Sequence, residues 1–187
     1  MSPAAATLSG LRNYATFSGR ASRAEYAWFL FFVFLVAIAA MLADRAIWGA
    51  EATGFLPDMP VWWRFRFDTG VSGGPLTDAW TVLTAVPLLA VTFRRLHDTG
   101  RPGWYALIPG AIASTAAGYV LWSLARHPGG IHVPEDLEAW LDGFGLARLF
   151  GLAMIALGAS VWLVVNLVRR TGRAANRYGP PTAEAPA

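Results

Sequence analysis

Three short polar segments of the 187-residue chain contain most of the side chains that could do chemistry. These are residues 17–26, 94–104 and 176–180. They combine many arginines with a few Asp, Glu, His and Asn side chains, and a guanidinium group matches a carboxylate or phosphate through paired donors. We therefore expect a candidate anionic site that comprises ten residues: Arg20, Arg23, Glu25, Arg94, Arg95, His97, Asp98, Arg101, Asn176 and Arg177.

A structural role is the alternative for the same side chains. Glu25 and Asp98 could pair with Arg94 or Arg95 and so tie helix ends together, while the remaining arginines set the membrane topology. The sequence leaves both interpretations open.

Catalytic and metal chemistry have less support in the sequence. The adjacent His97 and Asp98 are typical of metal phosphohydrolases, but such a site needs more His and Asp ligands than this part of the chain offers, and the chain has no cysteine. His127 and His132 are expected in an outer loop, with spacing that matches no metal-ligand pattern. The chain contains no GxSxG, P-loop or GxGxxG motif. We therefore expect no catalytic residue, metal or cofactor.

The composition indicates the class of protein to which these side chains belong. Hydrophobic residues make up 55% of the chain and charged residues only 14%, and the mean hydropathy is +0.41. A soluble domain has charges at about 25% of its positions. These values exclude a soluble domain, a disordered chain and a coiled coil, and they indicate a membrane protein.

Four apolar stretches predict an all-α, polytopic membrane protein. The expected spans are residues 26–43, 76–93, 102–125 and 149–168, because about 17 to 25 helical residues cross a bilayer. Ser22 and Glu25 form a capping-box pattern before the first span, and Thr77 and Asp78 are expected to cap the second. Pro87 must free a backbone carbonyl inside that second span.

The arginine distribution predicts the orientation of these spans. Ten of the 15 arginines lie in the two tails and the second loop, whereas the first and third loops contain five arginines and, with Asp78 at the start of the second span, nine acids. By the positive-inside rule, both termini are cytoplasmic. The net charge of +3 then reflects topology rather than nucleic-acid binding. We expect a single membrane domain over residues 1–187, a four-helix bundle with cytoplasmic tails at 1–25 and 169–187.

The polar segments also carry a family resemblance. FSGRASRAEY at residues 17–26, RRLHDTGRPGWY at 94–105 and NRYGP at 176–180 resemble the motifs of small bacterial inner-membrane proteins grouped as domain of unknown function 805. Ala27, Pro102 and Tyr105 replace residues that are commoner in that family, and the long first loop is particular to this chain. The resemblance implies an inner-membrane protein of a family without an assigned activity.

These observations favour a membrane interaction or scaffold protein. Its cytoplasmic Arg/His/Asp face would bind an anionic lipid headgroup or an acidic membrane-protein partner, with no nucleic acid involved. Two alternatives stay open. One is a small oligomeric transporter, and the other is a membrane enzyme that uses His97 as general acid or base on a lipid or phosphate ester.

Overall fold

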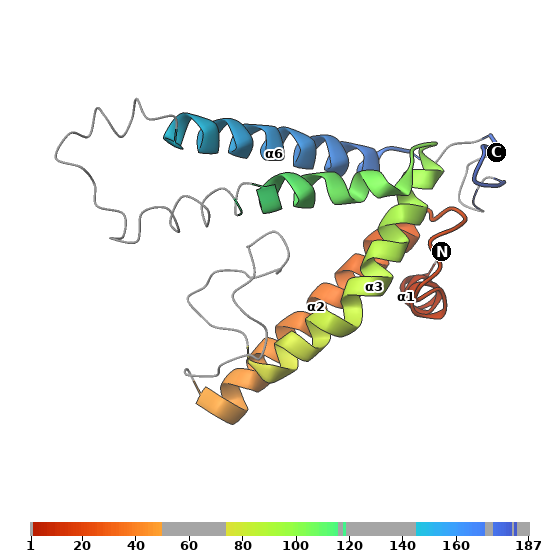
Figure 1. The fold of residues 1–187 in the computed structure, drawn as a ribbon. Coiled ribbons are helices and arrows are strands. Elements are labelled where there is room, and N and C mark those ends of the chain that lie inside the picture. The colour runs from red at the N-terminus through yellow and green to blue at the C-terminus, as the bar shows by residue number, and fades with distance from the viewer. Residues whose placement is uncertain are drawn as a thin grey trace. The chain divides into compact units, whose positions relative to one another are not determined.

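A computed structural model describes residues 2–49, 74–115, 118, 145–170, 174–180 and 182, with only the backbone described for 145–149. The chain forms two compact units, one of residues 1–106 with 165–187 and the other of residues 107–164. The described residues are helical apart from turns and one isolated β-bridge, as the composition predicts (Figure 1).

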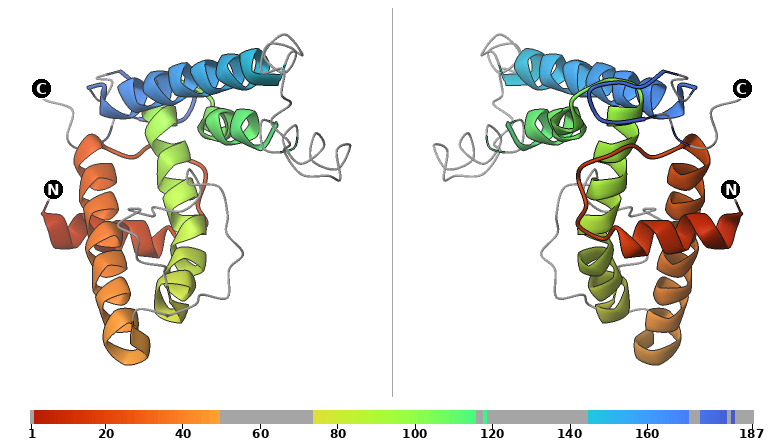
Figure 2. Two further views of the ribbon diagram at one scale, coloured as in Figure 1. Left: turned by 90° about the vertical axis from the view of Figure 1, so that its left-hand side faces the viewer. Right: turned by 90° about the vertical axis from the view of Figure 1, so that its right-hand side faces the viewer.

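Two long antiparallel helices form the centre of the first unit. Helix α2 comprises Arg23–Trp48 and helix α3 comprises Pro75–Asp98, and Figure 2 shows them side by side. Their buried contact contains the side chains of Ala21, Phe29, Val33 and Val91, flanked by Tyr26, Phe32, Trp80 and Leu88. The Trp80 indole stacks edge-on against Phe32 and donates to the Val33 carbonyl at 2.9 Å, so apolar packing and a buried hydrogen bond join the two helices.

Three described helices are long and apolar enough to cross a membrane. They are α2, α3 and residues Phe150–Val168 of helix α6, which comprises Gly145–Val168. All three begin before their predicted spans, and α2 and α3 also end later, with Arg45 in the last turn of α2 and Arg95 and His97 in the last turn of α3. Three of the four predicted spans are thus confirmed as helices of sufficient length.

The region of the remaining predicted span, 102–125, is described only in part. Helix η2, a 3-10 helix of Gly103–Leu107, is followed by helical residues 108–115. Most of the later part of this span lies outside the described residues, as does most of the long first loop. The four-helix bundle and the cytoplasmic location of the termini therefore stay predictions.

The start of α3 differs from the prediction. Its N-cap is Gly74 and not Thr77 or Asp78. The backbone amides of its first turn, which have no partner within the helix, donate to a side chain of α2. The buried carboxylate of Asp44 accepts hydrogen bonds from the amides of Leu76 at 2.9 Å and Thr77 at 2.8 Å. A Cβ at residue 74 would overlap the Asp44 side chain, so glycine permits this close approach. An aspartate of one helix thus caps the next helix.

Helix α1, Pro3–Arg12, is an element that the sequence did not predict. Ser2 caps it, with its side chain accepting from the Ala5 amide at 3.3 Å, and Pro3 occupies the first turn. Figure 2 shows α1 lying across both α2 and α3.

The second unit contains the helical residues 108–115 and most of α6. Large apolar side chains of α6 are exposed, including Phe150, Ile155, Leu157 and Val161 at 55% to 69%. Ser160 folds its hydroxyl back onto the Ala156 carbonyl at 2.8 Å, which satisfies that polar group within the helix. This apolar surface suits contact with lipid.

Candidate functional site

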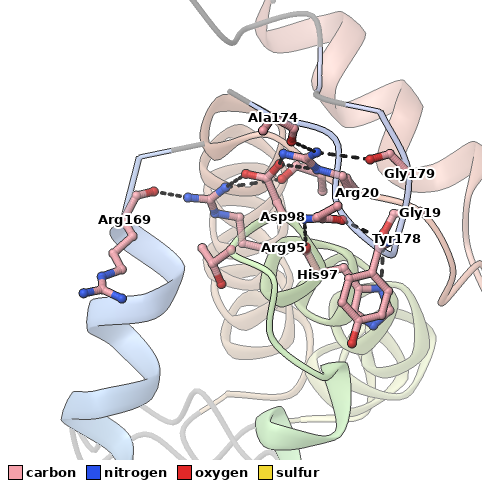
Figure 3. Close-up of polar contacts among 12 residues, drawn as sticks. Gly19, Arg20, Arg95, His97, Asp98, Arg169, Ala174, Tyr178 and Gly179 are labelled. Atoms are coloured by element: carbon pink, nitrogen blue, oxygen red, sulfur yellow. Dashed lines mark hydrogen bonds and ion pairs between the residues drawn. The ribbon is translucent and has the colours of Figure 1, made fainter. Parts of the chain in front are cut away.

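Two arginines hold the carboxylate of Asp98 at the C-terminal end of α3 (Figure 3). Arg20 contacts Oδ1 through Nε at 2.9 Å and Nη2 at 2.8 Å, and Nη1 of Arg95 lies 2.5 Å from Oδ2. The three side chains are at most 2% exposed. Each carboxylate oxygen therefore meets a guanidinium, and the charge of Asp98 is neutralised within the protein.

The guanidinium of Arg95 also holds the end of α6. Its Nε donates to the Leu167 carbonyl at 2.8 Å, and its Nη2 donates to the Arg169 carbonyl. A further hydrogen bond of 3.4 Å runs from Nη1 to the carbonyl of Ala21, two residues before α2. The last carbonyls of a helix lack intrahelical partners. Arg95 supplies those partners and joins α6 and the start of α2 to α3.

A second buried ion pair joins α2 and α3 directly. Nη1 of Arg94 lies 2.8 Å from Oε1 of Glu25, and the same oxygen accepts from the Ser9 hydroxyl of α1 at 3.0 Å. Ser22 caps α2 by accepting from the Glu25 amide, as the capping-box pattern predicts. The Glu25 carboxylate thus links three helices. Nε and Nη2 of Arg94 are buried without a hydrogen-bond partner among the described residues.

His97 is enclosed by the N-terminal and C-terminal segments. Its Nδ1 lies 3.2 Å from the Gly19 carbonyl, and its ring stacks on Tyr178 with centroids 3.8 Å apart and planes 6° apart. The Asn176 amide donates to the His97 carbonyl at 2.9 Å. Figure 3 shows the Tyr178 ring lying over the imidazole. These contacts give His97 a packing role.

The C-terminal segment forms a tight turn that receives Arg20. Asn176 and Gly179 exchange backbone hydrogen bonds of 3.1 and 3.0 Å, and Gly179 adopts a φ of +130° that favours glycine. Nη1 of Arg20 donates to the carbonyls of Ala174 at 2.9 Å and Gly179 at 3.3 Å. Arg20 therefore connects this turn to Asp98.

Seven of the ten candidate residues converge, and we call them the clasp: Arg20, Glu25, Arg94, Arg95, His97, Asp98 and Asn176. Their contacts join the three polar segments that lie far apart in the sequence. Pairing of Glu25 with Arg94 and of Asp98 with Arg95 was the structural alternative, and the structure forms both pairs. For these residues the contacts therefore favour a structural role.

The other three candidates are not part of the clasp. Arg23 is exposed on the first turn of α2, and Arg177 is exposed with its guanidinium 4.8 Å from the Tyr178 ring centre. Arg101 is half-buried, and its amide donates to the Leu96 carbonyl at 3.0 Å.

Sequence reasoning missed several partners of the clasp. Tyr178 lies within the polar segment 176–180, but its aromatic ring carries no charge that would mark it as a partner of His97. Ser9 belongs to the unpredicted helix α1, and no pattern pointed to it. Carbonyls such as those of Leu167 and Gly19 have no sequence signature at all.

An open cleft of about 500 Å³ lies beside the clasp. Asp98, which faces it, is already neutralised by two ion pairs. Arg169 and Arg170, directly after the last residue of α6, are exposed at its edge. Figure 3 shows the Arg169 side chain directed away from Asp98 while its carbonyl faces Arg95. The lining residues are Asp98, Thr99, Gly100, Arg169, Arg170, Ala174, Ala175 and Asn176.

This arrangement presents exposed guanidinium groups at the edge of the cleft. The buried acids of the clasp are bound by arginines, so the exposed arginines dominate the charge of the cleft. Among the described residues, no group of three His, Cys, Asp or Glu side chains could hold a metal ion.

The fold and the clasp define a helical membrane protein whose helix ends are tied by buried arginine pairs. A family model described as "Protein of unknown function (DUF805)" matches residues 14–180, which cover all three polar segments. The chain belongs to this family, as the motifs indicated. No curated protein and no solved structure matches it.

Proposed function

We propose that this protein is a multi-pass inner-membrane interaction protein that binds an anionic lipid headgroup at the cytoplasmic side. The proposed spans include α2, α3 and α6, and the tails lie in the cytoplasm. The arginine excess in the tails and second loop supports this orientation.

The observation that carries the proposal is the position of Arg169 and Arg170 at the cleft. They follow Val168, the last residue of a helix that is apolar enough to span a bilayer. Side chains at such a position lie at the level of lipid phosphates. Guanidinium groups bind phosphate through short, charge-assisted hydrogen bonds. A lipid phosphate is therefore the anion that these two side chains meet first.

The clasp supports the proposal by removing competing negative charge. Glu25 and Asp98 are buried in ion pairs, whereas Arg23, Arg169, Arg170 and Arg177 stay exposed on the segments that the clasp joins. Nine of the ten candidate residues thus fall into two groups, the seven of the clasp and the exposed Arg23 and Arg177, and Arg169 and Arg170 add to the second group. The clasp residues hold the shape, and the exposed arginines attract the anion.

The contacts of His97 do not favour the enzyme alternative. One imidazole nitrogen faces a carbonyl, and Tyr178 covers a face of the ring. No contact of the described residues favours the transporter alternative.

Native co-purification tests the proposal. The protein is extracted from bacterial membranes, and bound lipids and proteins are identified by mass spectrometry. We expect wild type to retain anionic phospholipid and the double variant Arg169→Gln/Arg170→Gln to lose most of it. Arg45→Gln is the matched control, because Arg45 is an exposed arginine at the other end of α2.

Two results would contradict the proposal. Equal amounts of anionic phospholipid on wild type and the double variant would show that the two arginines do not bind it. If the double variant instead loses a co-purifying acidic protein while its bound lipid is unchanged, the two arginines bind a protein partner and not a lipid.

A further inference from the structure

Helix α1 packs closely on the two helices that the proposed topology places in the membrane. Ala6 and Gly10 are buried on its inner side. A Cβ at residue 10 would overlap the Phe29 ring, so glycine allows α1 to contact α2 without a gap. Phe29 lies within the first predicted span. The contact therefore places α1 beside an apolar part of α2.

Two hydrogen bonds fix the position of the N-terminal segment along the lengths of α2 and α3. At one edge, the Ser9 hydroxyl donates to Glu25, which belongs to the clasp. At the other edge, the hydroxyl of Tyr14, just after α1, donates to the Leu83 carbonyl at 2.5 Å. Leu83 precedes Arg94 by 11 residues, or about 16 Å of helix. The N-terminal segment thus extends from the charged end of α3 into its apolar part.

The Leu83 carbonyl is the one that Pro87 frees. Pro87 has no amide hydrogen, so it cannot donate to the carbonyl four residues earlier in α3. An unsatisfied carbonyl is costly in an apolar environment. Tyr14 supplies the missing donor, and this bond matters most where water is scarce.

Leu8, Leu11 and Arg12 are exposed on α1, away from its buried side. Arg12 lies three residues after Ser9 and so shares the edge that faces the clasp. Leu8 and Leu11 are exposed at 47% and 43%, on the side away from Ala6. A long arginine side chain can reach the headgroups while its helix lies lower.

Lipid is the occupant that fits the exposed side of α1. Next to it, α2 and α3 also expose large apolar side chains, including Phe31 at 50%, Leu35 at 48%, Val82 at 51% and Leu83 at 57%. These side chains face the bilayer if the two helices span it.

We infer that α1 is an interfacial helix, inserted into the leaflet next to the clasp, with Leu8 and Leu11 in contact with lipid. The inference rests on the proposed membrane crossing of α2 and α3. Interfacial helices of this kind lie about 5–10 Å within the headgroup and acyl boundary. The N-terminal 12 residues would then be a membrane-bound element instead of a free cytoplasmic tail.

Site-directed spin labelling tests this placement, because the chain has no cysteine of its own. Single variants Leu8→Cys and Leu11→Cys are labelled with a nitroxide in the full-length protein, in vesicles of phosphatidylglycerol and phosphatidylethanolamine. Power saturation then compares the accessibility to oxygen, which partitions into lipid, with that to a water-soluble nickel chelate. Leu35→Cys is the control for a label on α2 that faces lipid if this helix spans the membrane. Ser18→Cys is the control for a label at an exposed polar position.

We expect both α1 labels to have a several-fold higher ratio of oxygen to nickel accessibility than Ser18→Cys. Low accessibility to both reagents would mean that protein covers α1, and that result would overturn the inference. Nickel accessibility equal to that of Ser18→Cys would also overturn it, while a lipid-exposed Leu35→Cys label would leave the membrane crossing intact. A nickel-accessible Leu35→Cys label would overturn the membrane crossing, and the inference with it.

Discussion

Arg95 and Asp98 lie one helical turn apart on α3 and form a buried ion pair, with 2.5 Å between Nη1 and Oδ2. The same Arg95 caps the end of α6, and the same Asp98 binds Arg20. The pair therefore connects segments that are far apart in sequence. A buried ion pair is not necessarily more stable than apolar packing, but loss of one partner leaves the other charge uncompensated.

Asp98→Asn should strongly destabilise the protein. The substitution leaves Arg20 and Arg95 without their shared buried carboxylate, and the expected cost is about 3–5 kcal/mol in the free energy of unfolding. Unfolding of the purified protein in detergent measures the effect. Arg45→Gln, a charge change at an exposed site, should leave stability almost unchanged. Equal stability of Asp98→Asn and wild type would show that the ion pairs do not hold the fold.

Asp44→Ala should destabilise the α2–α3 pair from its other end. It removes both acceptors for the Leu76 and Thr77 amides, and loss of a helix cap costs about 1–2 kcal/mol. Asp44→Asn keeps one acceptor oxygen and should retain part of this stability. Hydrogen exchange of the first turn of α3 reports the change locally. Unchanged protection in Asp44→Ala would refute the capping role.

Tyr14→Phe should cost about 1 kcal/mol, because it removes the donor to the Leu83 carbonyl. In a Pro87→Ala background, the new amide of residue 87 can donate to the same carbonyl. The cost of Tyr14→Phe should then fall close to zero. A double-mutant cycle measured by unfolding isolates this coupling. Equal costs in the two backgrounds would show that Tyr14 does not compensate for the proline.

The sequence predicted those features that repeat along a helix or stand next to each other. Apolar stretches located α2, α3 and α6, and Ser22 caps α2 as its position before Glu25 suggested. The sequence also selected the seven clasp residues, but it could not choose between pairing and binding. That choice depends on three-dimensional distances, such as the 2.8 Å between Arg94 and Glu25, which are 69 residues apart.

Contacts between distant segments account for the errors and omissions. Thr77 and Asp78 have typical capping side chains, yet Asp44 on the neighbouring helix caps α3. Helix α1 has ten residues with Leu8 and Leu11 as its large apolar side chains, which is too short a pattern to predict a helix, and its position depends on the fit of Gly10 to Phe29. Local sequence patterns do not predict such pairings, because neither partner has neighbours in the sequence that distinguish it from other residues of its type.

Lipid affinity at the cleft of Arg169 and Arg170 directly tests whether these two side chains bind an anionic headgroup. Native mass spectrometry with increasing phosphatidylglycerol or phosphatidylcholine gives a Kd for each lipid. We predict that wild type and Arg45→Gln prefer phosphatidylglycerol, and that Arg169→Gln/Arg170→Gln weakens its binding about tenfold, or about 1.4 kcal/mol. The same phosphatidylglycerol Kd for all three proteins would contradict the account.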